Sequence, residues 1–393
     1  MVLVRFVAVV VAGVLGGVVV PAGPVRAAQC LGPGQVVAGV PAELKAYAPS
    51  RLAGLATGAG VRVAVIDSGV DARNPQLKGQ VLAGRDLLHN AADGRRDCVG
   101  HGTAVAGIIA GLPDARSGVQ GLAPGATIIP VRVSEDTDLD GRSPGGGRQS
   151  SAAAFAQAIT WAAGTARADV INISLVMPSE DTQVRAAIAE AVEGGVVVVA
   201  AAGNGGATGG VAFPAGYPGV IGVGAVTGDG TIADYSQPGP HVDIAAFGDG
   251  VTVLAPLRGH RPVQGTSFAA PFVSATVALL RERFPRESAS QLTQRLLRSA
   301  DPAPGGIRSS QYGAGVLNPY RALTEEAGPV AAGVSRVSAA PVAAAGGGEW
   351  ARAGVFAAGG AGLAVLAGLV AAVVARGRRR GWQAAHGHDQ MPG

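Results

Sequence analysis

Residues 265–275 read Gly-Thr-Ser-Phe-Ala-Ala-Pro-Phe-Val-Ser-Ala. They place one hydroxyl, that of Ser267, at the start of a segment whose small apolar residues predict a buried helix. A serine hydroxyl is a poor nucleophile unless a neighbouring base removes its proton. A catalytic role for Ser267 therefore requires a base elsewhere in the chain and a group that orients this base.

Two further motifs supply candidates for these partners. Residues 100–107 read Gly-His-Gly-Thr-Ala-Val-Ala-Gly and contain His101, and residues 64–70 read Ala-Val-Ile-Asp-Ser-Gly-Val and contain Asp67. In a triad the histidine takes the proton of the serine, while the aspartate holds the imidazole tautomer and stabilises the cation that forms. Each residue alone has an ordinary structural explanation, such as a turn, a satisfied histidine or a helix cap. The three complete motifs together favour catalysis.

Runs rich in Val and Ile alternate with helix-like segments between these motifs. Nearly continuous apolar runs indicate strands covered on both faces, and their alternation with helices indicates a parallel α/β sheet. The active site of such a sheet lies at the carboxyl ends of its strands, and Asp67 directly follows one run. The strand-like runs are residues 61–66, 127–133, 169–175, 196–200 and 220–225, and the helix-like segments are residues 151–163 and 181–193.

At these motifs the chain resembles the subtilisin-like serine proteases, or subtilases, in which Asp, His and Ser follow one another in this order. The resemblance implies a subtilisin-like parallel sheet flanked by helices, with Asp67, His101 and Ser267 as the catalytic triad. It also implies that Asn204, in the run Ala-Ala-Ala-Gly-Asn-Gly-Gly of residues 200–206, donates its amide to the oxyanion. A fixed donor is needed because negative charge develops on the carbonyl oxygen. A turn asparagine beside glycines is the alternative.

Residues 173–178 read Ile-Ser-Leu-Val-Met-Pro and follow a predicted strand. In subtilases the matching segment is commonly Ser-Leu-Gly-Gly and pairs with the substrate backbone as an added strand. The resemblance therefore implies that Ser174, Leu175 and Val176 contact the substrate. Val176 and Met177 stand where the glycines are common, and their side chains either narrow the first specificity pocket or alter a loop. Ordinary strand-end residues are the alternative.

Both ends of the chain indicate export and anchoring. Residues 1–28 combine Arg5, an apolar run over residues 6–20 and a small-residue end, which is typical of a cleaved signal peptide; an uncleaved anchor is the alternative. Residues 353–375 carry no charge and are long enough to cross a membrane, whereas a buried core helix is the alternative. Four arginines follow in residues 376–380, so the positive-inside rule places this end in the cytoplasm.

The predicted organisation is a signal peptide at 1–28, an N-terminal extension at 29–58, a subtilase domain at 59–325, a linker rich in Ala, Gly and Pro at 326–352, a transmembrane helix at 353–375 and a cytoplasmic tail at 376–393. This layout resembles that of the mycosins, which are membrane-anchored subtilases of type VII secretion systems. The resemblance implies a single-pass protein of the cell membrane, with its catalytic domain on the extracytoplasmic side. It also implies protein or peptide substrates, with secretion-complex subunits as candidate partners.

The chain has two cysteines, Cys30 and Cys98. An even number of cysteines in an exported protein suggests one disulfide. This bond would fasten the N-terminal extension close to His101 in the chain. Two separate thiols are the alternative.

Other ligands have little support in the sequence. The net charge of +4 is small, and no basic stripe with interleaved aromatic residues indicates nucleic-acid binding. The subtilase resemblance implies that no cofactor is required. Residues 136–141, Asp-Thr-Asp-Leu-Asp-Gly, begin a calcium-loop pattern, but Gly147 stands at the twelfth position, where a glutamate is needed. A solvated acidic turn is therefore favoured over a structural calcium site, and no metal ligands are assigned.

Three functions fit these observations. The leading hypothesis is a tethered serine endopeptidase that cuts exported proteins. The second is a structural component of a secretion complex whose catalysis is dispensable, and the third is a general degradative surface protease. The presence of all four catalytic pieces argues against an inactive enzyme.

Overall fold

The computed structural model describes residues 30–91, 93–135, 147–304, 308–326 and 376. The predicted signal peptide, the predicted transmembrane segment, the tail beyond residue 376 and nearly all of the predicted linker lie outside these residues. The acidic segment 136–141 also lies outside them. No helix within the described residues is long and apolar enough to cross a membrane.

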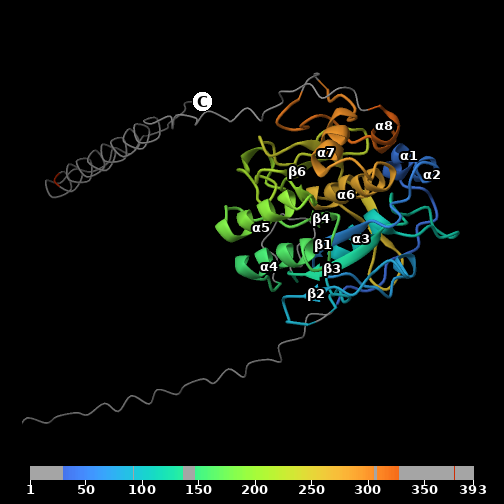
Figure 1. The fold of residues 1–393 in the computed structure, drawn as a ribbon, viewed down its shortest axis with the longest axis horizontal. Coiled ribbons are helices and arrows are strands. Elements are labelled where there is room, and N and C mark those ends of the chain that lie inside the picture. Colours follow the sequence, from blue (N-terminus) through green and yellow to red (C-terminus); the bar gives the residue numbers. More distant parts are fainter. Residues whose placement is uncertain (1–29, 92, 136–146, 305–307, 327–375, 377–393) are drawn as a thin grey trace, which may run out of the picture. The chain divides into compact units, whose positions relative to one another are not determined.

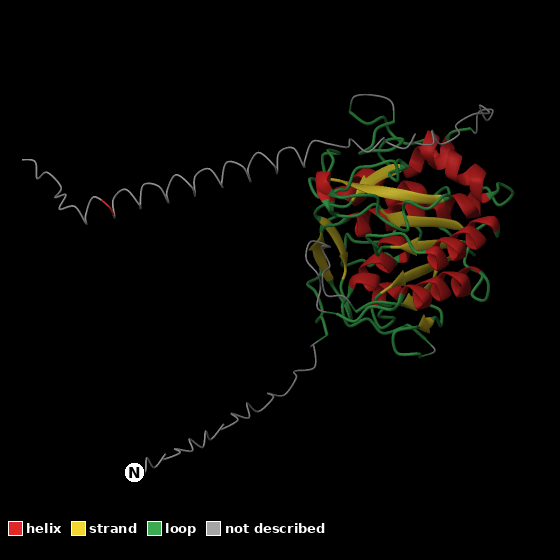
Figure 2. Ribbon diagram, turned by 90° about the vertical axis from the view of Figure 1, so that its left-hand side faces the viewer, coloured by secondary structure: helices red, strands yellow, loops and turns green. Residues whose placement is uncertain are grey.

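A seven-stranded sheet with the order β2-β3-β1-β4-β5-β6-β7 forms the centre of the fold (Figures 1 and 2). Every neighbouring pair in it is parallel, as the apolar runs predict. The five expected strands are confirmed with ends within two residues, and the two strands of this sheet that were not predicted are its edge strands β2 and β7. The strands are β1 (Arg62–Asp67), β2 (Arg85–Asp86), β3 (Thr127–Arg132), β4 (Val170–Ile173), β5 (Val197–Ala201), β6 (Val220–Val226) and β7 (Ile244–Phe247).

Helices cover both faces of this sheet, which gives three layers (Figure 1). α3 and α6 lie on one face, and α4 and α5 lie on the other. The helices expected from the sequence are α4, α5 and the buried helix that begins beside Ser267, which is α6. The residues before α4 and α5, Ser151 and Asp181, cap these helices by accepting backbone N–H bonds. The four helices are α3 (His101–Ala110), α4 (Ala152–Ala163), α5 (Thr182–Glu193) and α6 (Thr266–Arg283).

Strand β1 shows why the central runs are apolar at every position. Val63 and Val65 belong to the core beneath α3 and α6, whereas Ala64 and Ile66 belong to the core beneath α4 and α5. Successive side chains of a strand point to opposite faces, so a strand covered on both sides needs apolar residues throughout. All four side chains are fully buried.

The remaining elements surround this sandwich. α1 and α2 lie in the N-terminal extension, and their residues Leu44, Tyr47 and Leu52 join the core on the α3 and α6 side. β8 and β9 form an antiparallel hairpin that leads into α6. These elements are α1 (Ala42–Tyr47), α2 (Pro49–Ala53), β8 (Val251–Leu254), β9 (His260–Val263), α7 (Ala289–Arg298), α8 (Pro319–Thr324), and two short 3₁₀ turns, η1 (Pro75–Leu77) and η2 (Gly206–Thr208).

The order of the strands changes direction at β1. β3 pairs with one edge of β1, and the next strand in the sheet's other half, β4, pairs with the opposite edge. In parallel α/β sheets, ligands bind beyond the carboxyl ends of the strands at such a reversal. Asp67 is the last residue of β1, so the topology places it at this point.

Candidate active site

Ser267 lies in the first turn of α6, and its neighbours shape this turn. The N-cap residue Gly265 has a φ of 144°, a conformation that residues with a side chain rarely adopt. Pro271, four residues after Ser267, has no N–H, so the carbonyl of Ser267 lacks its usual intrahelical partner. The hydroxyl of Ser174, just beyond β4, donates to that carbonyl at 2.7 Å instead. The nucleophile's backbone is thus held by a neighbouring strand end.

A buried series of hydrogen bonds holds Ser174 in turn. Ser274 Oγ donates to Asn172 Oδ1 at 2.8 Å, and Asn172 Nδ2 donates to Ser174 Oγ at 2.9 Å. Ser174, predicted from the sequence as a substrate contact, lines the cleft, and its hydroxyl donates to the backbone of Ser267. Asn172 and Ser274 were not predicted from the sequence, although a proline four residues after a serine in a helix signals that the serine carbonyl needs another donor.

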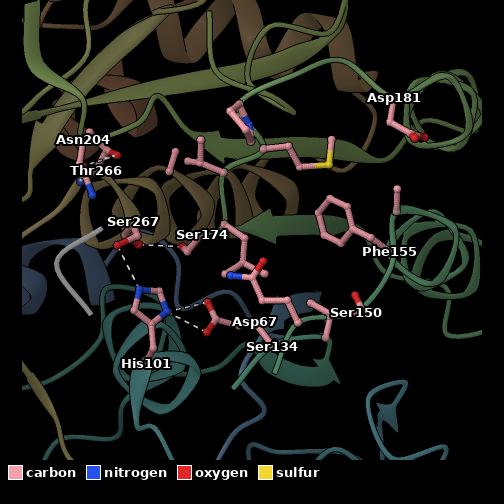
Figure 3. Close-up of a pocket in the computed structure, with 18 of the residues that line it drawn as sticks. Asp67, His101, Ser134, Ser150, Phe155, Ser174, Asp181, Asn204, Thr266 and Ser267 are labelled. Atoms are coloured by element: carbon pink, nitrogen blue, oxygen red, sulfur yellow. Dashed lines mark hydrogen bonds and ion pairs between the residues drawn. The ribbon is translucent and has the colours of Figure 1, made fainter. Parts of the chain in front are cut away.

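The side chains of Asp67, His101 and Ser267 form a continuous series of hydrogen bonds (Figure 3). The Nε2 atom of His101 lies 3.0 Å from Ser267 Oγ, and its Nδ1 atom lies 2.8 and 2.9 Å from the two carboxylate oxygens of Asp67. All three residues are buried. One ring nitrogen can therefore accept the serine proton while the carboxylate fixes the other, which is the geometry of a serine nucleophile with its base.

Close backbone packing sets the position of His101. The first turn of α3 lies against the loop after β1, where a Cβ atom on Gly102 would come 2.0 Å from the carbonyl oxygen of Gly69. Only a glycine permits this approach. The ring of Phe268 packs beside the imidazole, with the two ring centres 4.9 Å apart. Its apolar face excludes water from one side of His101.

Asn204 lies beyond the end of β5. Its Oδ1 atom accepts hydrogen bonds from the N–H and the hydroxyl of Thr266, each at 2.9 Å, and its amide nitrogen faces the Ser267 side (Figure 3). A methyl group on Gly265 would lie 3.3 Å from that nitrogen and 3.0 Å from Ser267 Oγ. One point in space therefore contacts both groups, as an oxyanion next to the attacked carbon requires.

These groups open onto a cleft of about 900 Å³. Leu175 and Val176 line it, and Val176 is 44% exposed. Met177 also lines it and forms two backbone hydrogen bonds with Phe213, of 2.7 and 3.0 Å, which brace this segment. Three further apolar residues of the lining were not predicted from the sequence, because only the fold brings them to the cleft: Val133, Ala152 and Phe155.

The cleft carries little positive charge. Among its described lining residues, Glu180 and Asp181 are the charged groups outside the triad, and no lysine or arginine occurs. Glu180 forms an ion pair with Arg185, and Asp181 accepts N–H bonds from Gln183 and Val184 as the cap of α5. An acidic side chain of a bound peptide would therefore find no cationic partner in this part of the cleft.

The structure confirms the disulfide between Cys30 and Cys98, whose Cα atoms lie 4.3 Å apart. The N–H of Leu31 donates to the carbonyl of Cys98 at 2.8 Å. The side chain of Leu31 also lies against Gly100, the residue before His101. The bond therefore fastens the N-terminal extension to the loop that leads into α3.

No metal site emerges within the part of the chain that the structure describes. This part contains no group of three or more His, Cys, Asp or Glu side chains that could hold a metal ion. The acidic segment 136–141, for which a solvated turn was predicted, lies outside this part. The nucleophile, the base and the oxyanion donor of the candidate site are all side chains of this polypeptide.

Comparison with known sequences extends the match beyond the motifs. The model of the subtilase family, peptidase S8, matches residues 58–315. Mycosin-4 of Mycobacterium tuberculosis is 38% identical over 327 residues, which cover 74% of this chain and 70% of that protein. Subtilisin E of Bacillus subtilis is 36% identical over 265 residues, which cover 67% of this chain and 65% of that protein.

Solved structures show the same similarity in three dimensions. The MycP3 protease from the type VII (ESX-3) secretion system matches with a TM-score of 0.66 and 34% identity, covering 76% of this chain and 93% of that one. MycP1 from the ESX-1 type VII secretion system matches with a TM-score of 0.67 and 30% identity, covering 77% and 91%. The parallel sheet flanked by helices is thus a subtilisin-like fold.

Proposed function

Because the chain belongs to the subtilase family of serine peptidases, we propose that it hydrolyses peptide bonds of exported proteins with Asp67, His101 and Ser267 as its triad. The observation that carries the proposal is the series of hydrogen bonds that connects the Asp67 carboxylate, the His101 imidazole and the Ser267 hydroxyl. A chance meeting of these groups is improbable, since 34 and 166 residues separate them in sequence.

The geometry supports hydrolysis in two steps through an acyl-enzyme. His101 Nε2 takes the proton of Ser267 as Oγ attacks the peptide carbonyl carbon, and it then gives that proton to the leaving amine. A water molecule then attacks the ester carbonyl carbon in the same way. His101 takes its proton and returns it to Ser267 Oγ, which releases the acid and restores the hydroxyl. Asp67 holds the imidazole tautomer and stabilises its cation, while Asn204 donates to the oxyanion of both tetrahedral intermediates. Subtilases need no cofactor for this chemistry.

The substrate backbone is proposed to bind along residues 174–176. An extended peptide can add to a strand edge through main-chain hydrogen bonds, and pockets for alternate side chains then give specificity. Val176, whose side chain is half exposed in the cleft, narrows the first pocket and favours small residues before the cleaved bond. The negative charges of Glu180 and Asp181 disfavour acidic side chains of the substrate in the cleft.

The proposed setting is the extracytoplasmic face of the cell membrane, in association with type VII secretion. Two observations support it: the uncharged run at 353–375 followed by arginines, and the similarity to MycP3 and MycP1, both described as parts of such systems. A chain truncated after Gly348 should leave the membrane fraction as a soluble, active domain. Retention of that truncated chain after a high-salt wash would contradict the proposed tether.

The decisive experiment compares the full chain with its Ser267→Ala variant. The unaltered protein should hydrolyse peptides and become labelled by a serine-directed phosphonate, whereas the variant should do neither. Continued labelling of the variant would refute the assignment of the nucleophile.

A structural role in a secretion complex is the second candidate, and the similarity to secretion-system proteases favours it over a general degradative role. Comparing secretion in a complete deletion with secretion in a Ser267→Ala strain separates the two. Loss of secretion in the deletion alone would indicate an assembly role that needs no catalysis.

A further inference from the structure

A second buried carboxylate lies behind the triad. Asp97 is 4% exposed and is not part of the cleft lining. Its Oδ1 atom accepts hydrogen bonds from Ser68 Oγ at 2.9 Å, from the N–H of Val99 at 3.1 Å and from the N–H of Gly100 at 2.7 Å. Its Oδ2 atom accepts from the N–H and the hydroxyl of Thr103, at 2.9 and 2.6 Å. The Asp97 carboxylate therefore accepts five hydrogen bonds, from the loop after β1 and from the start of α3.

The first branch of this network leads to Asp67. The N–H of Ser68 donates to Asp67 Oδ1 at 2.7 Å. The hydroxyl of Ser68 donates to Asp97 and accepts from the N–H of Gly102 at 2.9 Å. Asp97 thereby fixes the direction of this hydroxyl, which joins the carboxyl end of β1 to the first turn of α3.

The second branch leads to His101, the first residue of α3. The N-cap of this helix is Gly100, which has no side chain to accept the unpaired N–H groups of the first turn. Asp97 supplies the missing acceptor, because it binds the N–H groups of Gly100 and Thr103. A negative charge is favourable at this end of a helix. The turn that carries the imidazole is thus capped by a residue three positions upstream of its N-cap.

The environment of Asp97 is unfavourable for a charge that serves stability alone. Burial raises the pKa of its carboxyl, the hydrogen bonds from Thr103 and Gly100 oppose this rise, and the nearby charge of Asp67 adds to it. A buried charge is often no more stabilising than a well-packed apolar residue. Stability alone therefore does not account for the buried Asp97 carboxylate, whereas a role in holding the geometry of the site does.

We propose that Asp97 is a positioning residue of the catalytic site, which sets the angle and distance between the carboxylate of Asp67 and the imidazole of His101. The inference rests on the proposed function, since it names the residue that aligns the same triad. Asp97 itself touches neither the substrate nor the reacting atoms.

The test replaces Asp97 with asparagine and uses Asp71→Asn as a matched control. Asp71 is also a buried aspartate, but its carboxylate binds Arg73 and the N–H of Leu257. With rates normalised to active sites by phosphonate titration, kcat of Asp97→Asn should fall about 10²-fold, because small misplacements of catalytic groups cost this much. KM should stay unchanged, and the control should keep a kcat close to that of the unaltered protein.

A second readout does not depend on turnover. The proton between His101 Nδ1 and Asp67 gives a far-downfield NMR resonance whose position reports this hydrogen bond. It should move or broaden in Asp97→Asn and stay in place in Asp71→Asn. If Asp97→Asn does not fold, Ser68→Ala carries the same expectation, because it removes one donor of the network. The proposal is overturned if the resonance stays in place in Asp97→Asn and in Ser68→Ala, or if kcat of Asp97→Asn falls no more than that of Asp71→Asn.

The two proposals fail in different ways. A protein that shows the resonance but neither hydrolysis nor labelling contradicts the proposed function, while the resonance still decides the role of Asp97. Hydrolysis together with an unmoved resonance contradicts the role of Asp97 alone.

Discussion

Replacing Asn204 by aspartate tests the oxyanion donor with little change in shape. Aspartate retains an oxygen that can accept from the N–H and the hydroxyl of Thr266, both 2.9 Å from the present Oδ1. It lacks the amide N–H that faces the nucleophile. Asn204→Ala, by contrast, removes the donor and both hydrogen bonds to Thr266. The pair of variants therefore separates the donor from the scaffold that holds it.

The magnitude follows from when the donor acts. A group aimed at the oxyanion stabilises the transition state more than the bound substrate, so its loss lowers kcat and leaves KM nearly unchanged. Loss of one such donor in subtilisin lowers turnover on the order of 10²–10³, and the same range is expected for Asn204→Ala. At about 1.36 kcal/mol per tenfold change, this corresponds to about 2.7–4 kcal/mol. Asn204→Asp should lose at least as much, because a carboxylate repels the oxyanion.

Steady-state hydrolysis of a peptide substrate measures both constants, and thermal unfolding checks the fold. Asn204→Ala should also lose about 0.5–1.5 kcal/mol of stability for each hydrogen bond to Thr266, whereas Asn204→Asp should keep most of that stability. A fall in kcat below about tenfold, or a rise in KM with unchanged kcat, would refute the reasoning. Asn204 would then be a turn residue.

Three further outcomes are expected. Removing Cys30 and Cys98 together should lower the unfolding free energy by up to about 4 kcal/mol, because the bond spans 68 residues; a loss under about 1 kcal/mol in denaturant titrations would count against this. Burial lowers the pKa of His260, so the unfolded chain binds the proton first and stability falls below about pH 6.5. His260→Asn should flatten that acid slope, and an unchanged slope would show that other groups cause it. Gly265→Ala should abolish hydrolysis, since its methyl group occupies the space between nucleophile and oxyanion donor; near-normal turnover would show that this space is unused.

The sequence predicts the parts of this site whose residue types are dictated by chemistry. The proposed nucleophile Ser267, its proposed base His101 and the proposed amide donor Asn204 stand in recognisable motifs, because few other side chains can perform these tasks. The central strands are equally predictable, since burial on both faces leaves only apolar residues. The disulfide follows from the count of two cysteines together with the predicted export of the chain.

The supporting contacts are not predictable in this way. Asp97 and Ser68 look like ordinary loop residues in the sequence, and only the packing of α3 against the end of β1 joins them. Phe155 lines the cleft because α4 begins next to the cleft and Phe155 lies near the start of this helix. The edge strand β2 escapes detection because its two residues carry too little pattern to stand out. The edge strand β7 reads Ile-Ala-Ala-Phe and lacks the run of Val and Ile that marks the central strands.

The proposed nucleophile Ser267 and its proposed base His101 share one structural arrangement. Each lies in the first turn of a helix whose N-cap is a glycine, and a side chain outside that helix binds the backbone of this turn. Ser174 binds the carbonyl that Pro271 leaves open, and Asp97 binds the first turn of α3. The disulfide joins this arrangement at Cys98, the residue after Asp97. A cut anywhere in residues 32–58 would therefore leave Leu31 covalently attached beside His101, so proteolysis of the extension cannot by itself remove that support.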